Sequence, residues 1–241
     1  MKFKKFLKYL FFIALTIGLG FLYGFSSAKN QQKKITAIVV EFEEGENHFL
    51  SHAMVNKLLI QNNRTVKNQA KSVINLYSLE NEVSKNPYVE KVSIFLTVEG
   101  VLKSTIKQRV PVARIVLKNS SYYIDKEGIK IPLSTNFSAR VPLISGLKSD
   151  KKNKKIVALM QTILADDFLQ KEIVGIHKLN NNEYQLSVRS GNYKIDFGKL
   201  TNIDVKFKKL KAFYNKTFLD KTIENYKTIT VKYHNQVVCT K

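Results

Sequence analysis

The chain has 241 residues, of which 44% are hydrophobic and 24% are charged, a composition typical of folded protein that excludes a disordered or collagen-like chain. Its single cysteine, Cys239, excludes a disulfide framework within the chain and a zinc site built on several thiolates. Lysine and arginine outnumber aspartate and glutamate by 40 to 19, which gives a net charge of +21. Seven of the lysines lie in residues 1–34, which contain no acidic residue, so the other +14 is spread along residues 35–241.

Residues 9–25 form an uncharged, mostly apolar run that predicts a membrane-spanning helix. At about 1.5 Å per residue its 17 residues extend about 26 Å, close to the ~30 Å of a hydrocarbon core. Phe21, Tyr23 and Phe25 at its far end are typical of the aromatic belt of a retained anchor. Small residues at positions 26 and 28 also fit a signal-peptidase site, so cleavage before Lys29 stays open as the alternative.

The basic tail sets the expected orientation of this span. Four lysines lie in residues 1–8, and a short basic tail before a first span normally stays in the cytoplasm. We therefore expect residues 1–8 in the cytoplasm and residues 9–25 as a single span of the cell inner (plasma) membrane. Residues 29–241 would then be periplasmic, or more generally extracytoplasmic.

Residues 35–108 predict a small α+β domain. A β-branched run at residues 35–42 predicts a strand, and Ser51 can cap a helix that ends near Asn62. A second helix fits residues 76–84, because Asn86-Pro87 stops it. Alternation in residues 89–97 and 101–108, around a turn at Glu99-Gly100, predicts a hairpin with matching apolar faces. The order β-α-α-β-β implies two helices on one side of a three-stranded sheet.

Residues 112–241 predict a second domain, mainly antiparallel β with accessory helices, beyond a proline-containing joint at residues 109–111. Apolar periodicity predicts helices over residues 154–165 and 203–214, and Asp166-Asp167 is expected to end the first of them. Loops at residues 180–182 and 190–192 carry the turn chemistry of hairpins. The expected strands are residues 112–117, 122–124, 129–133, 141–144, 173–179, 184–188, 193–197 and 228–238.

No residue pattern indicates catalysis, a cofactor or a small-molecule substrate. His48 and His52 have a metal-ligand spacing, but no third ligand is within sequence reach, so we expect surface histidines and no metal site. Neither a nucleophile elbow nor a phosphate-binding loop is present in the sequence. The positive charge would suit nucleic acid, but an exported domain does not meet its own genome. Basic residues that face anionic lipid or an acidic protein fit better.

Four motifs, in order behind a single amino-terminal span, resemble the bacterial cell-division family FtsQ/DivIB. They are Asn86-Pro87-Tyr88-Val89-Glu90-Lys91-Val92, Gln108-Arg109-Val110-Pro111-Val112-Ala113, Tyr122-Tyr123-Ile124-Asp125-Lys126-Glu127-Gly128 and Val141-Pro142-Leu143-Ile144-Ser145-Gly146. The resemblance implies a cytoplasmic tail, one span, a polypeptide-transport-associated (POTRA) domain at residues 35–108 and a β domain at residues 112–241. It also implies a non-enzymatic scaffold of the division machinery (the divisome), which recruits the FtsB/FtsL pair of single-span proteins at the division septum.

The resemblance further implies that the partner binds the carboxy-terminal strand, residues 228–238. A terminal strand is a natural sheet edge, and its unpaired main-chain groups can accept a strand from another chain. The alternative is that this strand only closes the sheet, with Ile229, Val231, Tyr233 and Val237 as core. The candidate partner-binding residues are Thr230, Val231, Lys232, Tyr233, His234, Gln236, Val237 and Val238.

Two other functions stay open at the level of the sequence. One is a POTRA-bearing component of outer-membrane protein transport or assembly, although that class normally continues into a long series of lipid-facing strands. The other is an anchored envelope protein that uses its positive charge on lipid or polymer. A midcell band of the protein in dividing cells would favour the division scaffold, and a uniform periphery the other two.

The expected topology predicts that a reporter active only after export, fused after Lys241, is active. It also predicts that the mature protein keeps its amino terminus, because residues 9–25 are retained as an anchor. Mass measurement of the purified protein checks this, and a mature chain that begins at Lys29 would contradict it.

Overall fold

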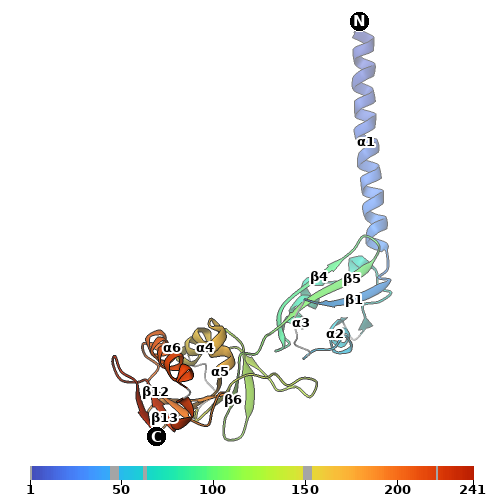
Figure 1. Ribbon diagram of the computed structural model, residues 1–241. Helices are drawn as coiled ribbons and strands as arrows, with labels where there is room; N and C mark the ends of the chain where they lie inside the picture. The colour runs from blue at the N-terminus through green and yellow to red at the C-terminus, as the bar shows by residue number, and fades with distance from the viewer. Residues whose placement is uncertain (1, 44–48, 62–63, 149–153, 221) are drawn as a thin grey trace. The chain divides into compact units, whose positions relative to one another are not determined.

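The computed structural model describes the chain except for residues 1, 44–48, 62–63, 149–153 and 221 (Figure 1). Its contacts divide the chain into two compact units. The first unit consists of residues 1–46 and 50–108, and the second of residues 47–49 and 109–241. Each unit has a core of its own.

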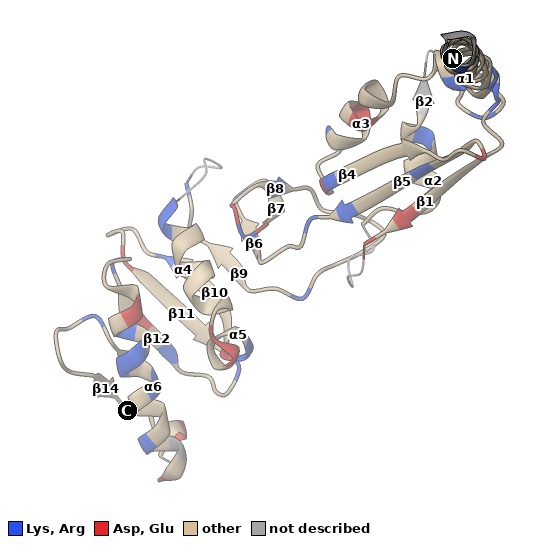
Figure 2. Cartoon of the chain, turned by 90° about the horizontal axis from the view of Figure 1, so that it is seen from above, with Lys and Arg blue, Asp and Glu red and all other residues tan. Residues whose placement is uncertain are grey.

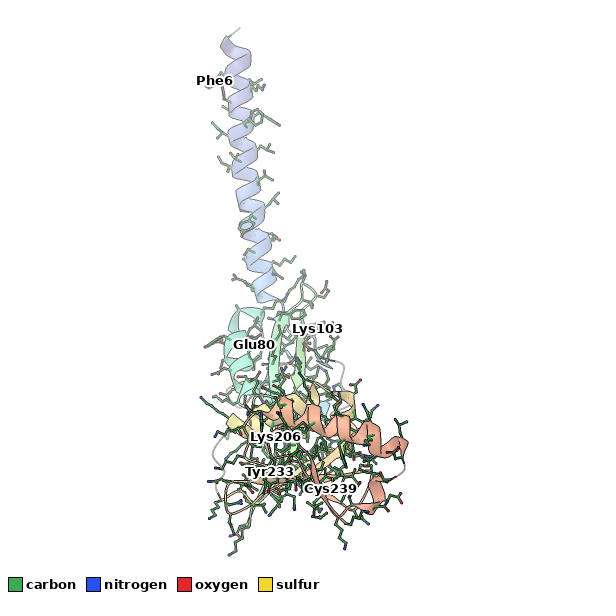
Figure 3. All side chains as sticks on the ribbon, turned by 60° about the vertical axis from the view of Figure 1, so that its left-hand side comes forward. Phe6, Glu80, Lys103, Lys206, Tyr233 and Cys239 are labelled. Atoms are coloured by element: carbon green, nitrogen blue, oxygen red, sulfur yellow. The ribbon has the colours of Figure 1, made fainter. Side chains whose placement is uncertain are left out.

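The chain begins with one long helix, α1 (Lys2–Gln32), which extends beyond the apolar run at residues 9–25. Among the described residues, only this helix is long and apolar enough to cross a membrane, and none of its apolar stretch is buried within the protein. From Phe6 onward its side chains point outward along the helix (Figure 3). An apolar surface left bare in this way is what a membrane-spanning helix requires.

The rest of the first unit has the predicted β-α-α-β-β order. Strands β1 (Ala37–Phe42), β5 (Val101–Gln108) and β4 (Val89–Leu96) form a sheet in that spatial order, with β1 parallel and β4 antiparallel to β5. Val92 lies opposite Ile106 and Leu96 opposite Leu102, as the alternation predicts. Helices α2 (His52–Leu58) and α3 (Leu76–Ser84) pack their buried residues into the same core.

Local capping explains where these two helices begin. The Ser51 side chain accepts a hydrogen bond from the Met54 N–H at 3.3 Å, as predicted for the N-cap of α2. Asn75 caps α3 in the same way. Helix α2 ends at Leu58, earlier than expected, because a short hairpin of β2 (Ile60–Gln61) and β3 (Arg64–Thr65) follows it. The expected end at Asn62 and the candidate ligand His48 lie outside the described residues. A 3-10 turn, η1 (Lys71–Val73), leads into α3.

In the described part of the second unit, nine strands form one sheet, in the order β14-β13-β12-β11-β10-β9-β6-β7-β8. Five of the eight neighbouring pairs are antiparallel, as the mainly antiparallel prediction requires. Three pairs are parallel: β6 with β9, β9 with β10, and β12 with β13. The strands are β6 (Ala113–Val116), β7 (Ser121–Ile124), β8 (Lys130–Ile131), β9 (Leu143–Ser145), β10 (Ile173–Lys178), β11 (Tyr184–Val188), β12 (Lys194–Gly198), β13 (Thr228–Thr230) and β14 (Val238–Thr240).

Helices supply the other side of this core and also carry two of the three parallel connections. Helices α4 (Lys154–Leu164) and α5 (Asp167–Glu172) lie between β9 and β10, and α6 (Ile203–Leu219) with the short η2 (Ile223–Asn225) lies between β12 and β13. Parallel neighbours need such crossovers, because a tight turn can join only antiparallel strands. Buried residues of α4 and α6 pack with those of the strands in one cluster.

One sequence-based expectation about this unit is incomplete, and another is wrong. Asp166 does more than end a helix, because its carboxylate accepts hydrogen bonds from the Phe168 and Leu169 N–H groups and so begins α5. The expected strand at residues 228–238 is two strands, β13 and β14, which pair antiparallel across a loop at residues 231–237. Asn235 in this loop has a φ of 55°, which no regular strand can contain.

Two of the family motifs meet at the start of the second unit. Arg109 donates a hydrogen bond to Asp125 Oδ2 at 2.8 Å, and both side chains are largely buried. Asp125 Oδ1 accepts from the N–H groups of Glu127 and Ile129, and Gly128 has a φ of 74°, as expected for this turn. The aspartate therefore holds both the hairpin loop and Arg109, where the chain leaves the first unit.

We predict that Asp125→Ala lowers the free energy of unfolding of the second unit by about 3 kcal/mol, because it leaves the Arg109 charge buried without its partner. Asp125→Asn should cost less, since its amide oxygen can still accept from the turn. Glu82→Gln is the control, because the Glu82–Lys85 pair is exposed and its loss should cost less than about 1 kcal/mol. Denaturant unfolding followed by tyrosine fluorescence measures the three values, and equal losses for Asp125→Ala and Glu82→Gln would contradict the assignment.

Candidate protein-binding surface

The last strands form one open edge of the nine-stranded sheet. Strand β14 pairs with β13 on one side and has no neighbouring strand on its other side among the described residues. We call the loop at residues 231–237 together with β14 the C-terminal edge. The opposite edge is β8, which has only two residues. A free edge can accept an added strand, and within this sheet β14 is the longer of the two edge strands.

The predicted partner-binding residues fall into three groups on this edge. Val231 is fully buried and belongs to the core, so its side chain is not offered to a partner. Tyr233 and Val238 are 46% and 41% exposed, and His234 and Gln236 are exposed as well. Thr230, Lys232 and Val237 are half-buried. The expected core role is correct for Ile229 and Val231 but wrong for Tyr233.

Two lysines fix the path of the loop. Lys209 of α6 donates to the backbone carbonyls of Val231 and Tyr233, at 2.8 and 2.5 Å. Lys232 forms ion pairs with Asp196 at 3.1 Å and with Glu183 at 3.4 Å. The loop is therefore held in place at residues 231–233.

The electrostatics of these contacts favour a charged, ordered Lys232. Its hydrogen bond to the Asp196 carboxylate, reinforced by Glu183, raises the pKa of Lys232 above its ordinary value. The ammonium also lies 5.7 Å from the centre of the Tyr233 ring, within cation–π range. Gly198 (φ 72°) completes the packing, because a Cβ there would lie 2.7 Å from the Cβ of Lys232.

The surroundings of the C-terminal edge are basic. Helix α6 carries five lysines and only one acidic residue, and Figure 2 shows its bands of positive charge. Burial and the nearby Lys209 charge lower the pKa of Lys206, whose ammonium donates to the Lys199 carbonyl. Figure 3 labels Lys206, Tyr233 and Cys239 in this part of the unit. A protein with acidic residues would be complementary to such a surface.

A hollow of about 450 Å³ adjoins the far end of β14. It is lined by the hairpin loop at residues 190–193 and by Glu224, Tyr226 and Lys227. The Lys227 N–H donates to the Thr240 carbonyl, which places the hollow beside the last residues of the strand. Behind it, Tyr193 and Tyr214 share a hydrogen bond at 3.0 Å, and burial raises the pKa of both, so they stay neutral.

Sequence reasoning missed the residues that hold the loop in place. Lys209, Glu183 and Asp196 are remote from residues 231–237 in the chain, and only the strand order brings them together. Asn235 is the one local sign in the sequence that the strand is interrupted, because asparagine is enriched at the positive φ that it adopts here. Among the described residues, no group of three histidine, cysteine, aspartate or glutamate side chains could hold a metal ion.

Family models match both folded parts of the chain. A POTRA-like domain model matches residues 34–107, and a model described as FtsQ/DivIB, C-terminal related, matches residues 110–240. No individually curated protein matches the chain. The two matches meet at the boundary between the two units of the structure.

These features define a membrane protein with one amino-terminal helix able to span the bilayer, a POTRA-like domain and a mixed sheet domain. The chain belongs to the FtsQ/DivIB family of bacterial cell-division proteins, because the C-terminal family model covers more than half of it. The matched families are of non-enzymatic, division-related domains. The C-terminal match favours the division family over outer-membrane transport, which the POTRA-like domain alone would leave open.

We predict that Lys232→Ala loosens the C-terminal edge without unfolding the unit. The change removes both ion pairs, so Tyr233 should become several-fold more sensitive to chymotrypsin at neutral pH. Lys227→Ala, at an exposed lysine just before β13, is the matched control and should leave the cleavage rate unchanged. Equal cleavage rates at Tyr233 in the two variants would show that the ion pairs do not order the loop.

Proposed function

We propose that this protein is a non-enzymatic scaffold of the division machinery, and that it recruits FtsB/FtsL-like single-span proteins through its extracytoplasmic part at the division septum. Membership of the FtsQ/DivIB family and the membrane-capable helix α1 support this proposal. The same proposal places the amino terminus in the cytoplasm and both folded units outside it.

The observation that carries the proposal is the open C-terminal edge. A partner segment can add a strand to β14, whose residues Val238–Thr240 form the outermost strand there. Main-chain hydrogen bonds would supply affinity, as in other cases of strand addition. Side chains of the loop that leads into the strand would supply selectivity, and Tyr233, His234 and Gln236 are exposed in that loop.

The anchored loop makes this surface suitable for recognition. Lys209 and Lys232 hold Tyr233 in place before any partner arrives, so little conformational entropy remains to be lost on binding. Tyrosine is a common anchor of interfaces, because it offers a large apolar ring and a polar tip. Val231, in contrast, supports the surface from within the core.

The test is co-purification with an FtsB-like single-span coiled-coil protein from the same cell. Tyr233→Asp and Val238→Asp should each weaken capture at least about tenfold, because each places a charge in a partly apolar contact, about 1.4 kcal/mol or more. Tyr77→Asp is the matched control, since Tyr77 is an exposed tyrosine of α3 in the first unit.

Circular dichroism and melting temperature show whether each variant remains folded. Folded Tyr233→Asp and Val238→Asp proteins that capture the partner as well as Tyr77→Asp does would refute the proposed binding edge. The family assignment would stand in that case, because it does not depend on where the partner binds.

A further inference from the structure

The end of the POTRA-like domain next to α1 is tied to that helix without a free linker. Helix α1 ends at Gln32, and hydrogen bonds begin with the next residues. The Lys71 N–H donates to the Lys33 carbonyl at 3.0 Å, and the Ile35 N–H to the Gln69 carbonyl at 2.8 Å. The Thr36 N–H donates to the Gly100 carbonyl at 2.9 Å. The chain therefore passes directly from the helix into the domain.

Lys71 joins the helix to the β4–β5 turn. Its ammonium donates to Asn30 Oδ1 in α1 at 3.2 Å and to the carbonyls of Thr97 and Val98 at 2.7 and 3.0 Å. Gly100 is needed here, because its φ is 94° and a Cβ would lie 2.8 Å from the Lys34 carbonyl oxygen. The tip of the turn is thus held at the level of Asn30.

The length of α1 sets the height of this turn above the hydrocarbon core of the membrane. The apolar run ends at Phe25, and Asn30 follows five residues later, about 8 Å further along a helix that rises about 1.5 Å per residue. The polar headgroup layer of a bilayer lies directly outside its hydrocarbon core. The turn at residues 97–100 therefore lies at or just above the headgroups when α1 spans the membrane.

This end of the domain carries exposed apolar residues and lysines, which suit the headgroup layer of a membrane. Val98 at the tip of the turn is 70% exposed, and Val73 of η1 is 63% exposed. Glu99 is the single acidic residue in this group, and the hydrogen bond from Thr97 lowers its pKa, with Lys33 and Lys71 contributing. Lys71 is engaged with Asn30 and the turn, and the other lysines of segments 29–36 and 66–73 are Lys29, Lys33, Lys34 and Lys67.

We propose that this end of the POTRA-like domain docks on the membrane that the chain spans, with lysines binding anionic phospholipid headgroups and Val98 entering the interface. The excess of lysines is complementary to the phosphate groups, and α1 brings the domain to the membrane surface. The inference rests on α1 being a membrane span and is independent of the partner site at the C-terminal edge.

The experiment uses the full chain in lipid vesicles, with Cys239→Ser as the background. A single cysteine replaces Val98 or, as the control, Lys91, and carries the environment-sensitive label NBD. Lys91 is exposed and lies seven residues back along β4, about 23 Å away at about 3.3 Å per residue. Quenching by a lipid with a nitroxide on its headgroup is measured in phosphatidylcholine with and without phosphatidylglycerol.

We expect quenching at least about twofold stronger at position 98 than at position 91 in vesicles that contain phosphatidylglycerol, and a smaller difference without it or at high salt. Lys29→Gln with Lys34→Gln should reduce the quenching at position 98. Lys118→Gln with Lys227→Gln removes the same charge from the second unit and should leave it unchanged.

Equal quenching at positions 98 and 91 would overturn the docking proposal. The role of anionic headgroups would be overturned if quenching at position 98 stayed the same without phosphatidylglycerol and after the Lys29 and Lys34 changes. A signal that depends on protein density in the vesicle, and not on the lipid, would identify a second copy of the chain as the occupant. None of these results bears on partner capture by Tyr233→Asp, so the two proposals fail separately.

Discussion

The parallel pairing of β13 with β12 determines where the chain ends and what its surface offers. Ile229 lies beside Ile195, and this register puts both residues in the core under α6. Because the two strands are parallel, the connection must cross over the sheet, and α6 makes that crossing. The remaining residues then fold back as β14 and become the outer strand. The open edge is therefore a consequence of the crossover.

The same helix also holds the loop at residues 231–237 in place. Lys209 lies on α6 and reaches the carbonyls of Val231 and Tyr233, which would otherwise lose their hydrogen bonds where β13 ends. Lys232 forms ion pairs with Glu183, just before β11, and with Asp196 in β12. Core packing, hydrogen bonds to the backbone carbonyls and ion pairs together hold the backbone of Tyr233 in place.

The sequence predicts local elements well and distant pairing poorly. Residues 76–84 and 101–108 are predicted with the bounds that the structure has, because Asn86-Pro87 and the Glu99-Gly100 turn are strong local signals. The error at residues 228–238 has a different cause. Apolar alternation continues past Thr230, but Lys209, Glu183 and Asp196 hold residues 231–233 in a loop, and none of them is near in sequence. The role of Asp166 as the cap of α5 is not visible in the sequence, because recognising it requires knowing that a second helix follows at once.

The open edges also indicate how the protein limits unwanted association. Strand β8 has only two residues and ends before Pro132, a residue that cannot donate to a neighbouring strand. Strand β14 has no proline, and its exposed Val238 lies beside a basic surface. Like charges on two copies of this chain would repel each other, whereas an acidic partner would be attracted. The basic charge therefore favours a different protein over a second copy.

Strand addition at the C-terminal edge can be tested by amide hydrogen exchange of the full chain with and without its FtsB-like partner. Binding should slow exchange in β14 and in residues 233–236, because an added strand pairs with the outer amides and covers the loop. Exchange at β8 and in the POTRA-like domain should change much less. Slowed exchange at β8 or in the first unit, with residues 233–240 unaltered, would show that the partner does not bind the C-terminal edge.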